Sequence, residues 1–263
     1  MLSVIIPVMD EAKTIEECLK SLKNQDLDRG EYEIILVDGN STDDTIKIAS
    51  PYADKIIPQK SRGIGGARSD GVEASRGDIL VFTDADTIHE SDWLKTISKN
   101  LNGKGYDMTT GPVLFYDGNF RSNLLQLWRK IYILLHLFGF YWLIGSNMAI
   151  KKEAYLKIDG HRNISILEDF DISMKMFKEG DILSKYDKMQ RVYTSSRRLT
   201  NLFTYLLIYT YGHYHYHITK DDDRLLNYPS FDKMDLRVML DIMGMRKTNG
   251  LYSKVSSRMR KKR

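Results

Sequence analysis

The segment DILVFTDAD at residues 78–86 decides the predicted fold, because an apolar strand ends there in two carboxylates. Similar apolar strands are expected at residues 3–7 and 33–37, and a shorter one at 55–57. Between the first two, apolar residues within the range 15–22 recur at helical spacing. This alternation predicts right-handed crossovers and a mostly parallel central sheet flanked by helices, which is an α/β fold.

Small polar residues mark where the intervening helices are expected to begin. Thr14, followed three residues later by Glu17, predicts a capping box. Ser41 is expected to cap the second helix, and Ser91 the helix that follows the two carboxylates. A glycine-rich stretch leads into another predicted helix over residues 67–74. Each helix would return the chain to the edge where the next parallel strand starts.

Acidic residues follow three of the predicted strands, at Glu11, at Asp38, and at Asp84 with Asp86. Ligands of such sheets bind beyond the carboxyl ends of the strands, so these acids are expected at one rim. Asp84 and Asp86 could both reach one Mg²⁺ or Mn²⁺ ion, which would also hold substrate phosphates. Taken alone, the pair is typical of a solvated turn. Asp38 either accepts hydrogen bonds from a base or ribose, or forms a turn.

Residues 62–68, RGIGGAR, combine glycines with two arginines. The glycines let a backbone approach a ligand closely, and Arg62 and Arg68 could offset phosphate charge. The spacing fits neither the dinucleotide-binding fingerprint nor the P-loop, so a flexible connection is the alternative.

The second part of the chain holds further charged candidates. Glu168 and Asp169 precede a predicted helix whose Phe170, Met174 and Phe177 would point inward. The two acids either cap that helix or include a general base poised for an acceptor hydroxyl. Either interpretation places both carboxylates at the start of the helix.

Basic and aromatic residues dominate the stretch that follows. Arg197 and Arg198 form either a surface pair or a clamp on a diphosphate group. His213 and His217 would share one face of a helix and could form a metal pair. The tyrosines around them favour an amphipathic aromatic stretch over residues 202–218 instead.

The charge of the chain is concentrated in its last 13 residues. The net charge is +4, but residues 251–263 carry six basic side chains and no acid, so the remainder has a charge near −2. A body of this charge excludes a nucleic-acid footprint across the fold. The basic tail is either solvated or attracted to an anionic membrane surface, and with residues 221–263 it is expected to form a C-terminal appendage.

Apolar patterning and cysteine content bear on location. The uncharged run at residues 131–144 is too short to span a bilayer and predicts a buried core helix or an interfacial helix. The first residues lack the pattern of a signal peptide. Cys18 is the one cysteine, which suits a reducing compartment. We therefore expect a cytoplasmic protein, with a peripheral membrane location as the alternative.

Six ordered motifs together resemble family 2 glycosyltransferases, which have the GT-A fold, a Rossmann-like sheet with flanking helices. The motifs lie at residues 3–11, 37–45, 65–71, 84–86, 145–150 and 167–169. The resemblance covers about residues 1–200. It implies a catalytic domain over residues 1–220, with a nucleotide-binding half to about residue 115 and an acceptor half from 116.

The resemblance implies a role for each matching residue on the donor side. Pro7 and Glu11 would line the nucleotide site, and Asp38 would contact the base. Arg68 and Arg62 would stabilise the nucleotide or its phosphates. The donor ribose and the metal ion would be held by Asp84 and Asp86.

On the acceptor side, Gly145, Ser146 and Asn147 would shape the sugar and acceptor pocket. Asp169 would deprotonate the acceptor, with Glu168 beside it. Arg197 matches no motif of the family, so its place on the leaving diphosphate is a hypothesis from charge alone.

The family resemblance implies an inverting transfer, dependent on Mn²⁺ or Mg²⁺, from a nucleotide-diphosphate sugar to a lipid-linked or saccharide acceptor. The Gln-x-x-Arg-Trp signature of processive synthases is missing, which favours a non-processive enzyme. Ser69 stands where many relatives carry asparagine. The alternatives are a nucleotide-sugar-binding protein without catalysis and a nucleotidyltransferase.

Overall fold

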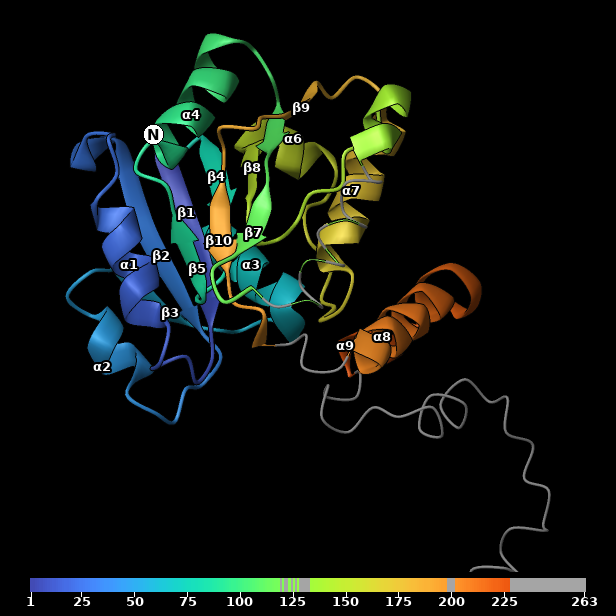
Figure 1. The fold of residues 1–263 in the computed structure, drawn as a ribbon, viewed down its shortest axis with the longest axis horizontal. Coiled ribbons are helices and arrows are strands. Elements are labelled where there is room, and N and C mark those ends of the chain that lie inside the picture. The colour runs from blue at the N-terminus through green and yellow to red at the C-terminus, as the bar shows by residue number, and fades with distance from the viewer. Residues whose placement is uncertain are drawn as a thin grey trace, which may run out of the picture.

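A computed structural model describes residues 1–118, 120, 123, 125, 127, 133–197 and 202–227. It contains a seven-stranded sheet of order β3-β2-β1-β4-β8-β6-β9, covered by helices (Figure 1). In that order its strands are Lys55–Pro58, Tyr32–Asp38, Leu2–Val8, Ile79–Phe82, Met148–Lys151, Met108–Thr110 and Ser184–Tyr186. β8 runs antiparallel to β4 and β6, and the other neighbours in this sheet are parallel. The predicted mostly parallel α/β sheet is therefore confirmed.

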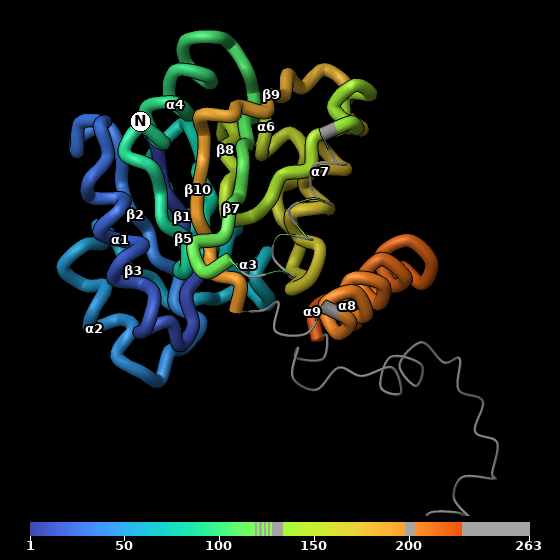
Figure 2. Tube along the Cα trace, viewed as in Figure 1, coloured from blue at the N-terminus to red at the C-terminus, as the bar shows by residue number. Residues whose placement is uncertain are grey.

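The helices alternate with these strands along the first part of the chain. The α-helices are α1 Ile15–Lys23, α2 Thr45–Ala49, α3 Gly63–Ala74, α4 Trp93–Ser98, α6 Lys152–Lys157, α7 Glu168–Glu179, α8 Leu202–Tyr214 and α9 Asp222–Leu226. The 3₁₀ turns are η1 Arg29–Glu31 and η3 Ile133–Phe138, and the π-helical turns are η2 Lys99–Gly103 and η5 His215–Thr219. Figure 2 shows α8 and α9 together on the α7 side of the molecule, away from α1 and α2.

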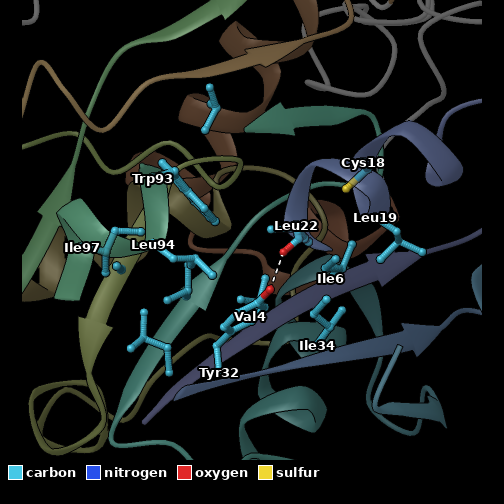
Figure 3. Packing of buried hydrophobic residues seen from close by; sticks show 14 of the residues in the cluster. Val4, Ile6, Cys18, Leu19, Leu22, Tyr32, Ile34, Trp93, Leu94 and Ile97 are labelled. Atoms are coloured by element: carbon cyan, nitrogen blue, oxygen red, sulfur yellow. Dashed lines mark hydrogen bonds between the residues drawn. The ribbon is translucent and has the colours of Figure 1, made fainter. Parts of the chain in front are cut away.

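The core lies on both faces of the sheet, as a nearly continuous apolar strand such as β1 requires. On one face, α1 and α4 pack Leu19, Leu22 and Trp93 against the strands (Figure 3). The Tyr32 hydroxyl donates to the Leu22 carbonyl at 2.7 Å, which ties β2 to α1. On the other face, α3, α6 and α7 cover a second cluster that includes Phe82.

A three-stranded sheet of order β5-β10-β7 joins distant parts of the chain. Its strands are Thr87–His89, Val192–Thr194 and Val113–Phe115. Thr194 lies opposite Thr87, and also opposite Phe115. Because β5 follows the two carboxylates directly, this pairing brings the segment after residue 194 beside them.

The predicted side-chain caps of three helices were wrong. α1, α2 and α4 have no side-chain cap hydrogen bond, although Thr14 does precede α1. Each predicted capping hydroxyl donates to a carboxylate instead: Thr14 to Glu11 at 2.9 Å, Ser41 to Asp38 at 2.7 Å, and Ser91 to Asp26 at 3.0 Å. The loop acids therefore hold the hydroxyls that the sequence pattern assigned to helix ends.

Two expectations for the second part do not hold as stated. Of the two alternatives for residues 131–144, the buried core helix is wrong, because this run contains the short turn η3, whose Leu137 is 82% exposed. The interfacial alternative stays a prediction. Phe177 is exposed on α7 and does not point inward. None of the helices in the described part of the chain combines the length and apolarity that crossing a bilayer requires.

The predicted boundary at residue 220 does not coincide with a break in packing. Leu225 of α9 is fully buried, and its carbonyl accepts from the backbone of Ser165 at 3.1 Å and Ile166 at 3.2 Å. Arg162 pairs with Asp222 at 2.5 Å. Residues 221–227 therefore belong to the body of the fold, whereas the basic tail at 251–263 lies outside the described residues.

Candidate active site

A cavity of about 570 Å³ opens beyond the carboxyl ends of β1 and β4, where sheets of this kind bind ligands. Its volume lies within the range of small-molecule sites, about 300–1,000 Å³. Most residues predicted for the site line it: Pro7, Glu11, Arg68, Asp84, Asp86, Gly145, Ser146, Glu168, Asp169 and Arg197. The structure thus gathers residues from six separate parts of the sequence around one space.

Arg68 of α3 joins the two acidic groups of the site. Its Nη1 donates to Glu168 Oε1 at 2.8 Å, and its Nη2 donates to Asp84 Oδ1 at 3.0 Å. Its side chain is 2% exposed. Burial opposes the charged form, but the charges of Glu168 and Asp84 leave the pKa of Arg68 raised. Arg68 therefore stays cationic and fixes the distance between the acids.

The absence of a side chain at Gly145 leaves space for the Arg68 guanidinium. A Cβ at residue 145 would lie 2.3 Å from Arg68 Nη2, closer than any packed contact. The glycines before Arg68 belong to a helix and not to a flexible connection, because α3 begins at Gly63. A Cβ at Gly65 would meet the Arg162 carbonyl oxygen at 2.1 Å, so Gly65 allows a close approach to the protein's own backbone. Gly63 lines the cavity, so the approach of this stretch to a ligand stays a prediction.

Glu168 and Asp169 occupy the first turn of α7. Asp169 Oδ1 accepts from the Phe170 amide at 2.7 Å, and Oδ2 accepts from the Gly145 amide at 3.4 Å. Burial and the neighbouring Asp169 charge raise the pKa of Glu168 to about 7, against the effect of Arg68. Burial likewise raises the pKa of Asp169. The two neighbouring carboxyls take up protons as a pair, and a raised pKa suits a general base that works near neutral pH.

Asp84 and Asp86 follow β4 and also line the cavity. Asp86 is 10% exposed and pairs with Arg197 at 3.2 Å, and the same guanidinium also contacts Glu11. Thr194 Oγ1 donates to Asp86 Oδ1 at 3.2 Å. The loop is further held by Cys18, a free buried thiol 3.5 Å from the Asp84 carbonyl oxygen.

The donor set fits a hard divalent cation. Carboxylate oxygens suit Mg²⁺ and Mn²⁺, and Asp84 and Asp86 both face the cavity. Among the residues that the structure describes, no group of three or more His, Cys, Asp or Glu side chains could hold a metal. A cation here would therefore take its remaining ligands from water and substrate oxygens, as Mg²⁺ usually does.

Three predicted residues lie outside the cavity lining. Asp38 accepts from the Ser41 amide at 2.9 Å, which is the turn that the sequence left as an alternative. Arg62 precedes α3 as its N-cap residue. Asn147 is fully buried, and its Oδ1 accepts from Trp93 Nε1 at 2.9 Å. Asn147 thus supports the loop beneath Gly145 and Ser146 and does not face the cavity, because its amide is used within the core.

The sequence prediction missed the wall supplied by α8. Tyr205, Ile208 and Tyr209 line the cavity, and their spacing of three and four residues was the available signal. α8 is not amphipathic as predicted, because apolar side chains lie on both its exposed and its buried sides. Leu206 is exposed, whereas Ile208 is fully buried.

The paired histidines of this region pack against each other. The rings of His213 and His217 stack at 5.7 Å, and both contact the Phe170 ring. Their spacing is explained by this aromatic packing around Phe170, which is the interpretation that the sequence favoured.

Residues 3–159 match the family model described as "Glycosyl transferase family 2". The chain belongs to this family, and the GT-A fold expected from the six motifs is confirmed by solved structures. A mannosyltransferase from Pyrobaculum calidifontis, solved with GDP-Man and Mn²⁺, superposes with a TM-score of 0.63 at 20% identity, over 83% of this chain and 63% of that one. S. aureus TarS with UDP-GlcNAc gives 0.59 at 19% identity, over 81% and 66%.

Relatives of known name share parts of the sequence. Glycosyltransferase AglE of Haloferax volcanii is 35% identical over 119 residues, which are 43% of this chain and 39% of AglE. A poly(ribitol-phosphate) beta-glucosyltransferase of Bacillus spizizenii is 26% identical over 220 residues, 70% of this chain and 33% of the relative. The chain thus spans only a third to two fifths of the length of these two proteins.

Proposed function

We propose that the chain is a non-processive, inverting glycosyltransferase that moves a sugar from a nucleotide-diphosphate donor to a lipid-linked or saccharide acceptor. One observation carries the proposal: Arg68 holds Asp84 and Glu168 at 3.0 and 2.8 Å across one cavity. This contact supports a site in which the metal-binding candidates and Asp169, the candidate base next to Glu168, face one bound sugar. A binding protein without catalysis has no need of a second, proton-accepting acid pair.

In this proposal, Asp84 and Asp86 hold Mn²⁺ or Mg²⁺ together with the donor diphosphate. The cation would offset the negative charge that grows on the leaving diphosphate. The solved neighbours bound to Mn²⁺ and nucleotide sugars support this donor class. Pro7 and Glu11 line the side of the cavity next to β1, where we place the nucleoside.

Asp169 acts as the base that takes the proton from the acceptor hydroxyl. The acceptor oxygen forms a bond to the anomeric carbon as the bond to the diphosphate breaks, so a single displacement inverts the configuration. The Gly145 amide and the helix start orient Asp169. Glu168 neutralises Arg68 beside it, and the shared proton affinity of the pair keeps a base available near neutral pH.

A donor panel tests the proposal directly. UDP, GDP, TDP and CDP sugars are incubated with the protein and Mn²⁺, and binding is measured by thermal shift and turnover by release of the nucleoside diphosphate. We expect one donor to stabilise the protein and to be consumed only with the metal present. Binding without any turnover across an acceptor panel would favour the non-catalytic alternative. Pyrophosphate release from a nucleoside triphosphate would favour the nucleotidyltransferase.

We further propose a cytoplasmic location with peripheral attachment to anionic membranes through residues 251–263. Six basic side chains there could each contribute up to about 1 kcal/mol near an anionic surface. Sedimentation with anionic liposomes, with and without this tail, is the test. Equal binding by both forms would remove the tail from the proposal.

A further inference from the structure

One wall of the cavity carries no assigned role. Tyr205, Ile208 and Tyr209 of α8 line it, and their spacing puts them on one face of the helix. α8 lies on the α7 side of the molecule, far from β2 and β3 (Figure 1). Asp169 lies in the first turn of α7 and lines the same cavity, whereas the expected nucleoside site is next to β1.

The two tyrosines form a pair of rings. Their centroids are 4.5 Å apart with an interplanar angle of 36°, and both side chains are partly open to the cavity. Burial raises the pKa of Tyr209 well above its ordinary value, and Tyr205 and Asp169 add to this effect. The Tyr209 hydroxyl is therefore within electrostatic reach of the candidate base and remains a neutral hydrogen-bond donor.

This chemistry matches one face of a pyranose ring. The C–H groups of a sugar carry partial positive charge and pack on the negative face of an aromatic ring. Its ring hydroxyls need donors and acceptors at the rim, which tyrosine hydroxyls provide. A bare polyprenyl phosphate would instead need a cation at this wall, yet the α8 residues that line the cavity are two tyrosines and an isoleucine.

We propose that Tyr205 and Tyr209 form the acceptor subsite and that its ligand is a pyranose ring. The acceptor is then a saccharide, free or carried on a lipid, and its attacking hydroxyl lies toward Asp169. This inference rests on the proposed function and deepens it. α8 also lies outside residues 3–159, the range that the family model matches, so the family pattern does not specify this wall.

The test uses the full chain saturated with UDP or GDP and Mg²⁺. Methyl β-D-glucopyranoside, methyl α-D-mannopyranoside and N-acetylglucosamine serve as pyranose probes, and decyl phosphate as the non-sugar probe. Binding is followed by ligand-observed NMR. The variants are Tyr205→Ala, Tyr205→Phe, which keeps the ring, and Phe203→Ala, which removes an aromatic ring from the same helix at a 55% exposed position outside the cavity.

We expect at least one pyranose to bind, and Tyr205→Ala to weaken it about tenfold, the effect of one ring contact of about 1.4 kcal/mol. Tyr205→Phe and Phe203→Ala should keep that affinity, and all variants should bind the nucleoside diphosphate like wild type. Three outcomes would overturn the subsite. They are pyranose binding that is unchanged in Tyr205→Ala, binding of decyl phosphate alone, and binding of no probe. If the wild-type protein does not bind the nucleoside diphosphate, the proposed function is overturned instead. The effect of Tyr205→Ala on pyranose binding would still test the subsite.

Discussion

The two walls of the cavity are built from different chemistry. The wall from β1, α3 and β4 is charged, and Arg68 and Arg197 pair its acids. The wall from α7 and α8 has two acids at its start and is otherwise apolar and aromatic. β1, α3 and β4 fall within the range that matches the family model, whereas α7, α8 and Arg197 follow it. The elements of the charged wall thus come from the part of the chain that the family shares, and the aromatic wall comes from the part beyond it.

Asp169 stands where the two walls meet, and replacing it should give the largest effect. Asp169→Asn keeps the shape of the side chain but removes the base, so we expect donor turnover to fall about a thousandfold. The affinity for the nucleoside diphosphate with Mn²⁺ should be unchanged, because the proposed function places the donor on the other wall. Steady-state turnover and calorimetry measure the two quantities. Equal rates in wild type and variant would remove Asp169 from the mechanism.

The pH dependence of turnover tests the pair formed by Glu168 and Asp169 without a mutation. Glu168 has its pKa raised to about 7 and shares its proton affinity with Asp169. Turnover should fall about tenfold per pH unit below about 7, as the pair takes up a proton, and should level off above it. The folded state binds this proton more tightly than the unfolded chain does. The contribution of Glu168 to stability is therefore largest below its ordinary pKa of 4.5 and decreases as pH rises to about 7.

A flat activity profile between pH 6 and 8 would contradict the pairing of the acids. Asp169→Asn provides the control for stability, because it removes one negative charge beside Glu168. The pKa of Glu168 should fall in that variant, which a shift in the pH dependence of thermal unfolding would report.

Gly145→Ala should disturb the pairing of Arg68 with Asp84 and Glu168 without removing a charged group. Its Cβ would lie 2.3 Å from Arg68 Nη2, so the guanidinium must move away from its acids. We expect a loss of about 1–3 kcal/mol, as for other overpacked sites. Differential scanning calorimetry should show a lower Tm, by about 2–4 °C per kcal/mol. Gly30→Ala is the matched control, since nothing lies within 4 Å of its Cβ. Equal destabilisation by both would refute the steric explanation.

Arg197 gives the smallest expected effect and probes the charged wall alone. Its guanidinium pairs with Asp86 and Glu11, where a divalent cation would compete with it. Arg197→Ala should therefore tighten Mn²⁺ binding in the absence of nucleotide, by about twofold to fivefold for a partly exposed pair. Calorimetry with Mn²⁺ alone measures this, and Arg76→Ala, outside the cavity, is the control. Weaker Mn²⁺ binding in the variant would show that Arg197 does not compete.

Much of the charged wall could be predicted, because its residues sit at fixed places in strand-ending motifs. Asp84 and Asp86 follow an apolar strand, and parallel strands end at one edge. Asn147 was misplaced because it belongs to the same short motif as Gly145, and only packing shows that its amide bonds to Trp93 inside the core. Tyr205 and Tyr209 were missed, because an aromatic helix has the same sequence pattern whether its rings fill a core or line a cavity.

The sequence by itself determined the alternating strands and helices, the GT-A class and the acids at the carboxyl edge. Each of these follows from local periodicity and from the order of short motifs, which the chain carries wherever it folds. Only the tertiary structure decided that Arg68 joins Asp84 to Glu168 and that the pairing of β10 with β5 brings Arg197 to Asp86. Such contacts span 16 to 111 residues of chain, and their geometry depends on the packing of the whole sheet.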